Sequence, residues 1–312
     1  MLGVRRSGTT LLRVMLDRHP RLAVPDESYF VPQLARRHQG PIDPQAFVED
    51  LRRLPTLREW RVRPDEVAQR LRAGMSTGDA IAAVYETYAA SRGKERWGDK
   101  TPMYMEHVGA LERLWPHACY VHLIRDGRDA AVSFLSMPKG VVTKTWAHPR
   151  SAADFACQWR REVRAARALG RRAGPERYLE LRYEELVRTP ENELRRICEF
   201  ASLPYEDTML EYVGNVDLSA KPHQQSLAKA PTPGLRNWRK DLAEADALAF
   251  EQVAGDLLAD LGYDVTSGPG AGSSVGGSVR RARYAALTTA WSAAAAAAQR
   301  SPLWRRRHPP VS

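Results

Sequence analysis

The residues best suited to chemistry lie near the start of the chain, in the run GVRRSGTTLLRVML at residues 3–16. Gly3 and Gly8 permit a tight turn, and a helix beginning at Thr9 would direct its unpaired backbone N–H groups and the positive end of its dipole at an anion. Further donors come from Arg5, Arg6, Ser7, Thr9 and Thr10. The run predicts a phosphate-binding turn; a surface turn before a basic helix is the plainer alternative.

The glycine spacing is that of a nucleotide P-loop, G-x-x-x-x-G followed by two polar residues, but Thr9 stands where that motif has lysine. A kinase or an ATPase would lose its contact with the β- and γ-phosphates. The sequence R-S-G-T-T at residues 6–10 instead resembles the sulfotransferase loop, which binds the 5′-phosphosulfate of the donor PAPS (3′-phosphoadenosine 5′-phosphosulfate). This resemblance implies that the donor is held by Arg6, which also takes part in catalysis, and by Ser7, Gly8, Thr9 and Thr10.

An acidic segment, P-D-E-S-Y-F-V-P at residues 25–32, follows a short apolar strand. Carboxylates at a strand end of an α/β protein lie where ligands usually bind. Residues 5–34 resemble the opening of the tyrosylprotein sulfotransferases and related bacterial sulfotransferases, which implies that Glu27 is the catalytic base that takes the acceptor proton. Asp26 is the second candidate, and an acid favoured by a helix dipole is the structural alternative for Glu27.

The resemblance fails at two positions after the base. The tyrosylprotein enzymes have two arginines there, which help to hold acidic peptides, whereas this chain has Tyr29 and Gln33. The difference argues against protein tyrosine as the acceptor. A carbohydrate, a lipid glycan, a phenol or a natural product, with a hydroxyl or amine as the accepting group, all remain open.

The segment W-G-D-K-T-P at residues 97–102 predicts a short strand, a turn and a helix that starts at Pro102. In sulfotransferases a lysine in this context points at the bridging oxygen between sulfate and nucleotide. The resemblance therefore implies that Lys100 stabilises the leaving oxygen in the transition state. A surface lysine near a turn is the plainer alternative.

A second signature follows the apolar run at residues 119–124, which is typical of a central parallel strand. The spacing of Arg125 and Ser133 resembles the sulfotransferase site for the 3′-phosphate, where a guanidinium presents a planar fork to phosphate oxygens. Arg128 and Asp129 are expected to be structural ion-pair partners. His122 is expected to be a core histidine because it lies within the apolar strand.

Two further donor contacts are implied by weaker resemblance. The pattern R-Y-E-E-L-V-x-x-P at residues 182–190 places a tyrosine near the adenine in sulfotransferases, so Tyr183 is either an adenine neighbour or a structural tyrosine. Residues 226–229 and 234–238 resemble the late loop that closes over the nucleotide. Ser226 would contact the 5′-phosphate side there.

The fold class expected is α/β, resembling P-loop-containing nucleoside triphosphate hydrolases, with a mostly parallel sheet and helices on both faces. We expect a sulfotransferase domain at residues 1–264. Within it, residues 36–95 form a helical insertion, either on the acceptor side or as a packing annex. Residues 265–312 are expected to form a flexible linker and a basic tail rich in Ala and Arg. Only residues 1–4 precede the first turn, which is short for a central strand, so a start a few residues upstream is expected.

The formal net charge of +10 favours an anionic partner, and residues 265–312 carry seven arginines and no Asp or Glu. This tail could contact a membrane surface or a polyanion, although a frayed tail is the default and no nucleic acid partner is expected. The three cysteines lack C-x-x-C spacing and no His/Cys cluster is present, so no metal is expected. With no membrane-spanning run and no signal sequence, a cytoplasmic enzyme is expected.

Together the motifs predict a PAPS-dependent sulfotransferase with PAPS as co-substrate. A divergent P-loop kinase is the second enzyme class, and the missing lysine counts against it. A non-catalytic polyanion-binding protein that uses the basic tail is the alternative of a different kind. The sequence leaves the oligomeric state open.

Overall fold

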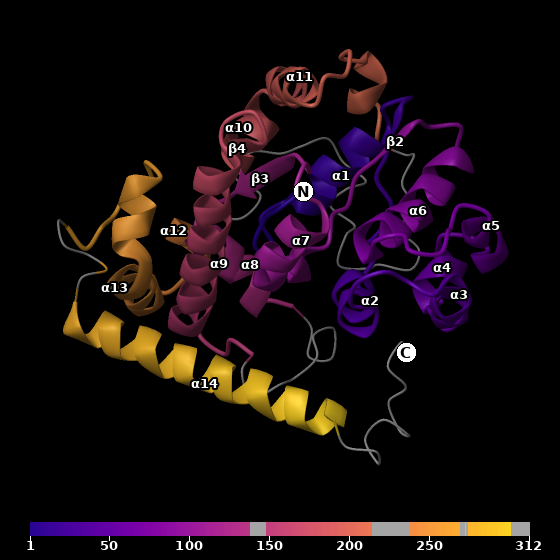
Figure 1. Ribbon diagram of the computed structural model, residues 1–312. Helices are drawn as coiled ribbons and strands as arrows, with labels where there is room; N and C mark the ends of the chain where they lie inside the picture. The colour runs from indigo at the N-terminus through magenta and orange to yellow at the C-terminus, as the bar shows by residue number, and fades with distance from the viewer. Residues whose placement is uncertain (138–147, 214–236, 269–271, 273, 301–312) are drawn as a thin grey trace.

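The computed structural model describes residues 1–137, 148–213, 237–268, 272 and 274–300 (Figure 1). Its strands are β1 (Leu22–Ala23), β2 (Arg96–Trp97), β3 (Tyr120–Ile124) and β4 (Tyr178–Arg182). The helices of the first half are α1 (Thr9–Asp17), α2 (Val31–Arg37), α3 (Pro44–Leu51), α4 (Pro55–Glu59), α5 (Pro64–Ala68), α6 (Thr77–Ala90), the 3-10 helix η1 (Pro102–His107), α7 (Val108–Leu114) and α8 (Gly127–Leu135). Those of the second half are α9 (Ala152–Ala173), α10 (Tyr183–Arg188), α11 (Pro190–Phe200), η2 (Asp207–Leu210), α12 (Trp238–Asp241), α13 (Glu244–Asp260) and α14 (Val275–Arg300).

The strands pair in parallel, β1 with β2 and β3 with β4. The first residues of the chain link the two pairs. Leu2 N donates to Val121 O at 2.8 Å, Leu123 N donates to Leu2 O at 2.9 Å, and the Met1 nitrogen donates to the carbonyl oxygen of Asp99 at 2.6 Å. The expected α/β class with parallel strands is thus confirmed, although the regular strands are short.

Strand β3 is buried along its whole length, which explains its continuous apolar run. Tyr120 and Ile124 belong to the core shared with α9 and α13, whereas Val121 and Leu123 belong to a second core shared with α1 and α11. Successive side chains point to opposite faces of a strand. Helices therefore cover both faces at β3, as the sequence predicts.

Residues 36–95 form a set of short helices whose ends are specified locally. Asp43 caps α3 through its side chain, and Ser76 caps α6 in the same way. Apolar residues of this region, such as Phe47 and Tyr85, belong to the main core. Figure 1 shows α2 to α6 on the right of the view and α9, α12 and α13 on the left, with α1, α7 and α8 between them.

The described residues after 264 lie against the body of the protein. Thr266 and Ser267 donate backbone and side-chain hydrogen bonds to Glu251 on α13. Helix α14 packs across α9 and α13, with Tyr284 buried and Arg281 donating to Val253 O at 3.1 Å (Figure 1). Helix α14 lies within the segment expected to be a linker and tail, while the division at residue 264 stays a prediction. Among the described helices, none has the length and apolar character to cross a membrane.

His122 is a core histidine, as its place in an apolar strand predicts. Its ring is fully buried, Nδ1 lies 2.5 Å from the Tyr178 hydroxyl oxygen, and burial lowers its pKa to about 3. Between that value and the ordinary 6.5 the unfolded chain binds more protons than the folded protein. Folding stability is therefore lost as the pH falls through this range.

We expect His122→Gln to reduce this acid sensitivity. Between pH 7 and pH 4.5 the free energy of unfolding should fall by about 2 kcal/mol less in the variant than in the native protein. Urea denaturation at the two pH values measures the difference, with the exposed His117→Gln as control. An equal loss in the variant and the native protein would contradict the argument.

Candidate active site

The turn after residues 1–4 has the shape that an anion site requires. Ser7 N donates to Val4 O at 3.0 Å, and the backbones of Arg6 and Gly8 are left-handed, with φ of 71° and 87°. Gly8 is the N-cap of α1, and no side-chain hydrogen bond caps this helix. The first amides of α1 are therefore directed at whatever occupies the turn.

Close packing explains both glycines of the turn. A Cβ atom on Gly8 would lie 2.2 Å from Cδ2 of Tyr183, and one on Gly3 would lie 2.5 Å from Cγ2 of Thr9. Either distance is well inside van der Waals contact. The turn thus packs closely against Tyr183, which is the first residue of α10 and directly follows β4.

Lys100 is the buried cation beside this turn. Its Nζ lies 2.6 Å from Oε1 of Glu27 and 3.3 Å from Oγ1 of Thr10, and its side chain is 1% exposed. Burial lowers the pKa of Lys100, and the Glu27 carboxylate opposes that effect. A carboxylate, an ammonium group and the predicted phosphate loop therefore meet at one place.

A buried polar cluster holds the segments that carry this carboxylate and ammonium group. Ser28 N donates to Thr101 Oγ1 at 3.0 Å, and Ser28 Oγ donates to Oδ2 of Asp99 at 2.7 Å. Tyr85 on α6 donates to the same Asp99 oxygen at 2.9 Å, and burial raises the pKa of Asp99. The helical region at residues 36–95 thus takes part in fixing the site.

The two acids of the acidic segment have different partners. Oδ1 of Asp26 lies 3.1 Å from a guanidinium nitrogen of Arg13 on α1, and Arg13 also donates to Val24 O at 3.2 Å. Glu27 instead pairs with Lys100. Asp26 therefore ties the strand end to α1, and Glu27 is the acid that faces the turn.

Arg6 of the turn meets Arg125, at the end of β3, and Ser133 on α8. Arg6 Nε donates to Ser133 Oγ at 3.0 Å, and Arg125 Nη1 donates to Arg6 O at 3.2 Å. The guanidinium of Arg125 lies 4.5 Å from the centre of the Tyr183 ring. The predicted sites for the 5′-phosphosulfate and the 3′-phosphate are therefore adjacent, with Tyr183 against both.

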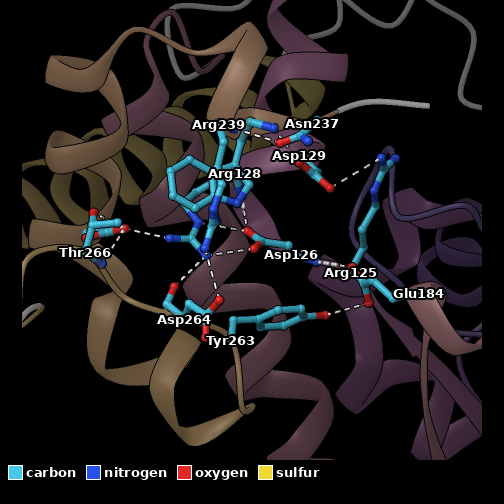
Figure 2. A network of polar contacts seen from close by, with 12 residues as sticks. Arg125, Asp126, Arg128, Asp129, Glu184, Asn237, Arg239, Tyr263, Asp264 and Thr266 are labelled. Atoms are coloured by element: carbon cyan, nitrogen blue, oxygen red, sulfur yellow. Dashed lines mark hydrogen bonds and ion pairs between the residues drawn. The ribbon is translucent and has the colours of Figure 1, made fainter. Parts of the chain in front are cut away.

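A network behind Arg125 fixes the start of α8 (Figure 2). Asp126 caps this helix and pairs with Arg128, whose Nη1 lies 2.5 Å from Oε1 of the buried Glu251. Asp129 accepts a hydrogen bond from Trp238 N at 2.8 Å, and burial raises its pKa to about 6. Arg128 and Asp129 each form ion pairs within the protein, Arg128 with Asp126 and Glu251 and Asp129 with Arg125 at 3.8 Å.

The remaining predicted site residues have mixed outcomes. Ser226 lies outside the described residues, as do residues 226–229 and most of 234–238. Trp238 is described, and its hydrogen bond to Asp129 places the end of that segment beside α8. Contact between Tyr183 and an adenine stays a prediction.

Tyr29 is a neighbour of Glu27 whose contact could not be predicted from the sequence. Tyr29 donates its hydroxyl hydrogen bond to Oε2 of Glu27. The sequence marks Tyr29 only as a replacement for arginine. Nothing in a linear motif indicates that a side chain two residues away turns back onto the carboxylate.

A family profile described as "Sulfotransferase family" matches residues 1–207. The chain belongs to the sulfotransferase family. "Protein-tyrosine sulfotransferase A" of Caenorhabditis elegans is 27% identical over 278 residues, covering 86% of this chain and 67% of that protein. "Nodulation protein NoeE" of Sinorhizobium fredii (strain NBRC 101917 / NGR234) is 28% identical over 301 residues, covering 85% and 65%.

A solved structure shows the same relationship at the level of the fold. A solved "Sulfotransferase Domain from the Synechococcus PCC 7002 Olefin Synthase" superposes with a TM-score of 0.57 at 24% identity, covering 85% of this chain and 94% of that one. The protein is thus a PAPS-dependent sulfotransferase with a P-loop-like fold, and the resemblance drawn from the motifs is confirmed. Family membership favours this function over the kinase and the polyanion-binding protein.

The polar atoms of the sulfotransferase site fit a donor with two separate anionic groups. Ser7 Oγ and Arg125 Nε are buried and have no hydrogen-bond partner among the described residues. Both lie in segments that the motifs assign to PAPS, one to its 5′ end and one to its 3′-phosphate. Unpaired buried donors are costly unless a ligand satisfies them. Among the described residues, no group of three or more His, Cys, Asp or Glu side chains could hold a metal ion.

We expect Gly8→Ala to damage donor binding through the packing of the turn. The added methyl group would overlap the Tyr183 ring, so affinity for 3′-phosphoadenosine 5′-phosphate (PAP, the product of the donor) should fall at least about tenfold. Calorimetric titration measures the affinity. Gly93→Ala is the matched control, because Gly93 has a similar φ of 67° with open space around it. Equal PAP affinity in the two variants would contradict the role of the packing.

Proposed function

We propose that this sulfotransferase moves the sulfuryl group of PAPS to an acceptor hydroxyl in a single in-line step, with Glu27 as the general base. The observation that supports this is the meeting of Glu27, Lys100 and Thr10, because the 2.6 Å and 3.3 Å contacts of the Lys100 ammonium bring the carboxylate to the phosphate loop. The acceptor oxygen forms its bond to sulfur, the bond from sulfur to the 5′-phosphate oxygen breaks, and the acceptor proton goes to Glu27.

Charge stabilisation is assigned to the cations around the turn. Negative charge grows on the 5′-phosphate oxygen as the bond to sulfur breaks, and the Lys100 ammonium lies 3.3 Å from Thr10 Oγ1 in the loop that holds this group. Arg6, the amides at the start of α1, and Thr9 and Thr10 hold the phosphosulfate. Arg125 and Ser133 hold the 3′-phosphate, which distinguishes PAPS from ATP.

The acceptor proposed is a hydroxyl compound with an apolar part, and not an acidic tyrosine peptide. Tyr29 and Met103 are exposed on the two segments that the Ser28–Thr101 hydrogen bond joins beside the base. Gln33 on α2 is half-buried and carries no charge. These side chains favour contact with an apolar surface over contact with acidic residues.

The donor assignment predicts selectivity for the 3′-phosphate. We expect the native protein to bind PAP much more tightly than ADP, and Arg125→Ala to lose about tenfold to a hundredfold in PAP affinity because a charge-assisted hydrogen bond is removed. Calorimetric titration with the two nucleotides measures this, with the surface substitution Arg188→Ala as control. Equal binding of PAP and ADP by the native protein would contradict the assignment of the 3′-phosphate site.

The base assignment predicts a loss of turnover without a loss of donor binding. We expect Glu27→Gln to lower the rate of transfer from ³⁵S-labelled PAPS by about two to four powers of ten while PAP affinity stays nearly the same. The assay uses an acceptor panel of phenols, sugars and glycolipids. Asp26→Asn is the matched control, because this acid pairs with Arg13 and should keep most of the activity. Full activity of Glu27→Gln would place the base elsewhere.

A further inference from the structure

Both oxygens of the Glu27 carboxylate have partners within the protein. Oε1 pairs with the Lys100 ammonium at 2.6 Å, and Oε2 accepts the hydroxyl hydrogen of Tyr29. A carboxylate offers about four lone-pair positions on its two oxygens. Donors on both oxygens therefore fix the plane of the carboxylate.

The backbone at Tyr29 is unusual for an aromatic residue. Its φ is 55°, and Phe30 N donates to Ser28 O at 2.7 Å across it. This is a three-residue turn with a left-handed central residue, which is rare and strained. Glycine would adopt this backbone without the steric conflict that a Cβ atom creates.

Strong contacts on either side hold this turn in place. Ser28 is fully buried and hydrogen-bonded to Thr101 and Asp99. Phe30 is 1% exposed, and its ring centre lies 5.5 Å from that of Trp60. Tyr29 itself is 47% exposed, so its ring contributes little to the core. A strained backbone around a side chain that adds little packing is typical of a residue retained for function.

The chemistry of the pair suits a permanent donor. Partial loss of contact with water and the neighbouring Glu27 carboxylate raise the pKa of the Tyr29 phenol well above its ordinary value. The phenol therefore stays protonated at any working pH. A hydrogen bond donated to the charged form of a carboxylate favours that form, which is the form a general base needs.

We infer that Tyr29 is a positioning residue that orients the Glu27 carboxylate and keeps it ionised. This inference rests on the proposed role of Glu27 as the base. Tyr29 holds Oε2, and Lys100 holds Oε1. The strained turn sets the direction from which the phenol reaches the carboxylate.

The test follows the ionisation of Glu27 directly and needs no acceptor. Protein labelled with ¹³C at glutamate carboxyl groups is titrated by NMR, and the Glu27 resonance is assigned by its absence in Glu27→Gln. We expect the titration midpoint in Tyr29→Phe to lie about one pH unit above that of the native protein, because a donor to the ionised form is lost. Tyr120→Phe is the control, since its buried hydroxyl has no hydrogen-bond partner among the described residues.

A second variant separates this role from a structural one. Tyr29→Gly also removes the phenol but relieves the left-handed strain, so its midpoint should shift as in Tyr29→Phe while its Tm stays the same or rises. An unchanged midpoint in both variants would overturn the inference. So would a rise in transfer rate in Tyr29→Phe, because that would mean that the phenol blocks the acceptor.

The inference and the proposed function fail in different ways. If Glu27→Gln abolishes transfer and the Tyr29 variants leave the midpoint unchanged, Glu27 remains the base and only the role of Tyr29 is lost. If Glu27→Gln transfers sulfate at the native rate, the base assignment is lost whatever the midpoints show.

Discussion

The buried pair of Lys100 and Glu27 is the interaction on which the rest of the site depends. An ammonium group that is 1% exposed needs a close counter-charge, because an unpaired charge inside a protein is very costly. Ser28, Asp99 and Thr101 bring the two segments together to make that pair. The depressed pKa of Lys100 shows that burial outweighs the help from Glu27. A ligand that brings anionic oxygens to this ammonium group would add the partners that its surroundings lack.

Close backbone approach is the second constraint, and it concerns the turn at Gly8. The α1 N-terminus can lie against Tyr183 only because residue 8 has no side chain. This contact, with the Arg125 guanidinium against the same ring, joins α1, the end of β3 and the start of α10. Sequence positions separated by more than a hundred residues thus form one set of donors. The Arg6–Ser133 hydrogen bond closes the set from α8.

The C-terminal part of the described chain supports this arrangement from behind. Arg128 is held by Asp126 and by Glu251 on α13, and Glu251 also accepts hydrogen bonds from Thr266 and Ser267. Removing one partner of such a buried pair is strongly destabilising, because it leaves an uncompensated charge inside the protein. The pair therefore fixes the position of α8 relative to α13. The first turn of α8 carries Asp129, which pairs with Arg125, and its second turn carries Ser133. The helices that follow residue 207, the end of the family match, therefore help to position the donor site.

The sequence alone determined the local features of this sulfotransferase: the turn with its two glycines, the buried strand β3, the core histidine and the family. These depend on residue type and short spacing, which the backbone obeys wherever the segment lies. The resemblance already favoured Glu27 over Asp26 as the base, but only the tertiary structure gave the two acids their partners, Arg13 for Asp26 and Lys100 for Glu27. The sequence also could not predict the contact of Tyr29 with Glu27 or that of Tyr183 with Gly8. They arise from a strained turn and from close packing between distant segments. Neither produces a regular spacing of residue types in the sequence.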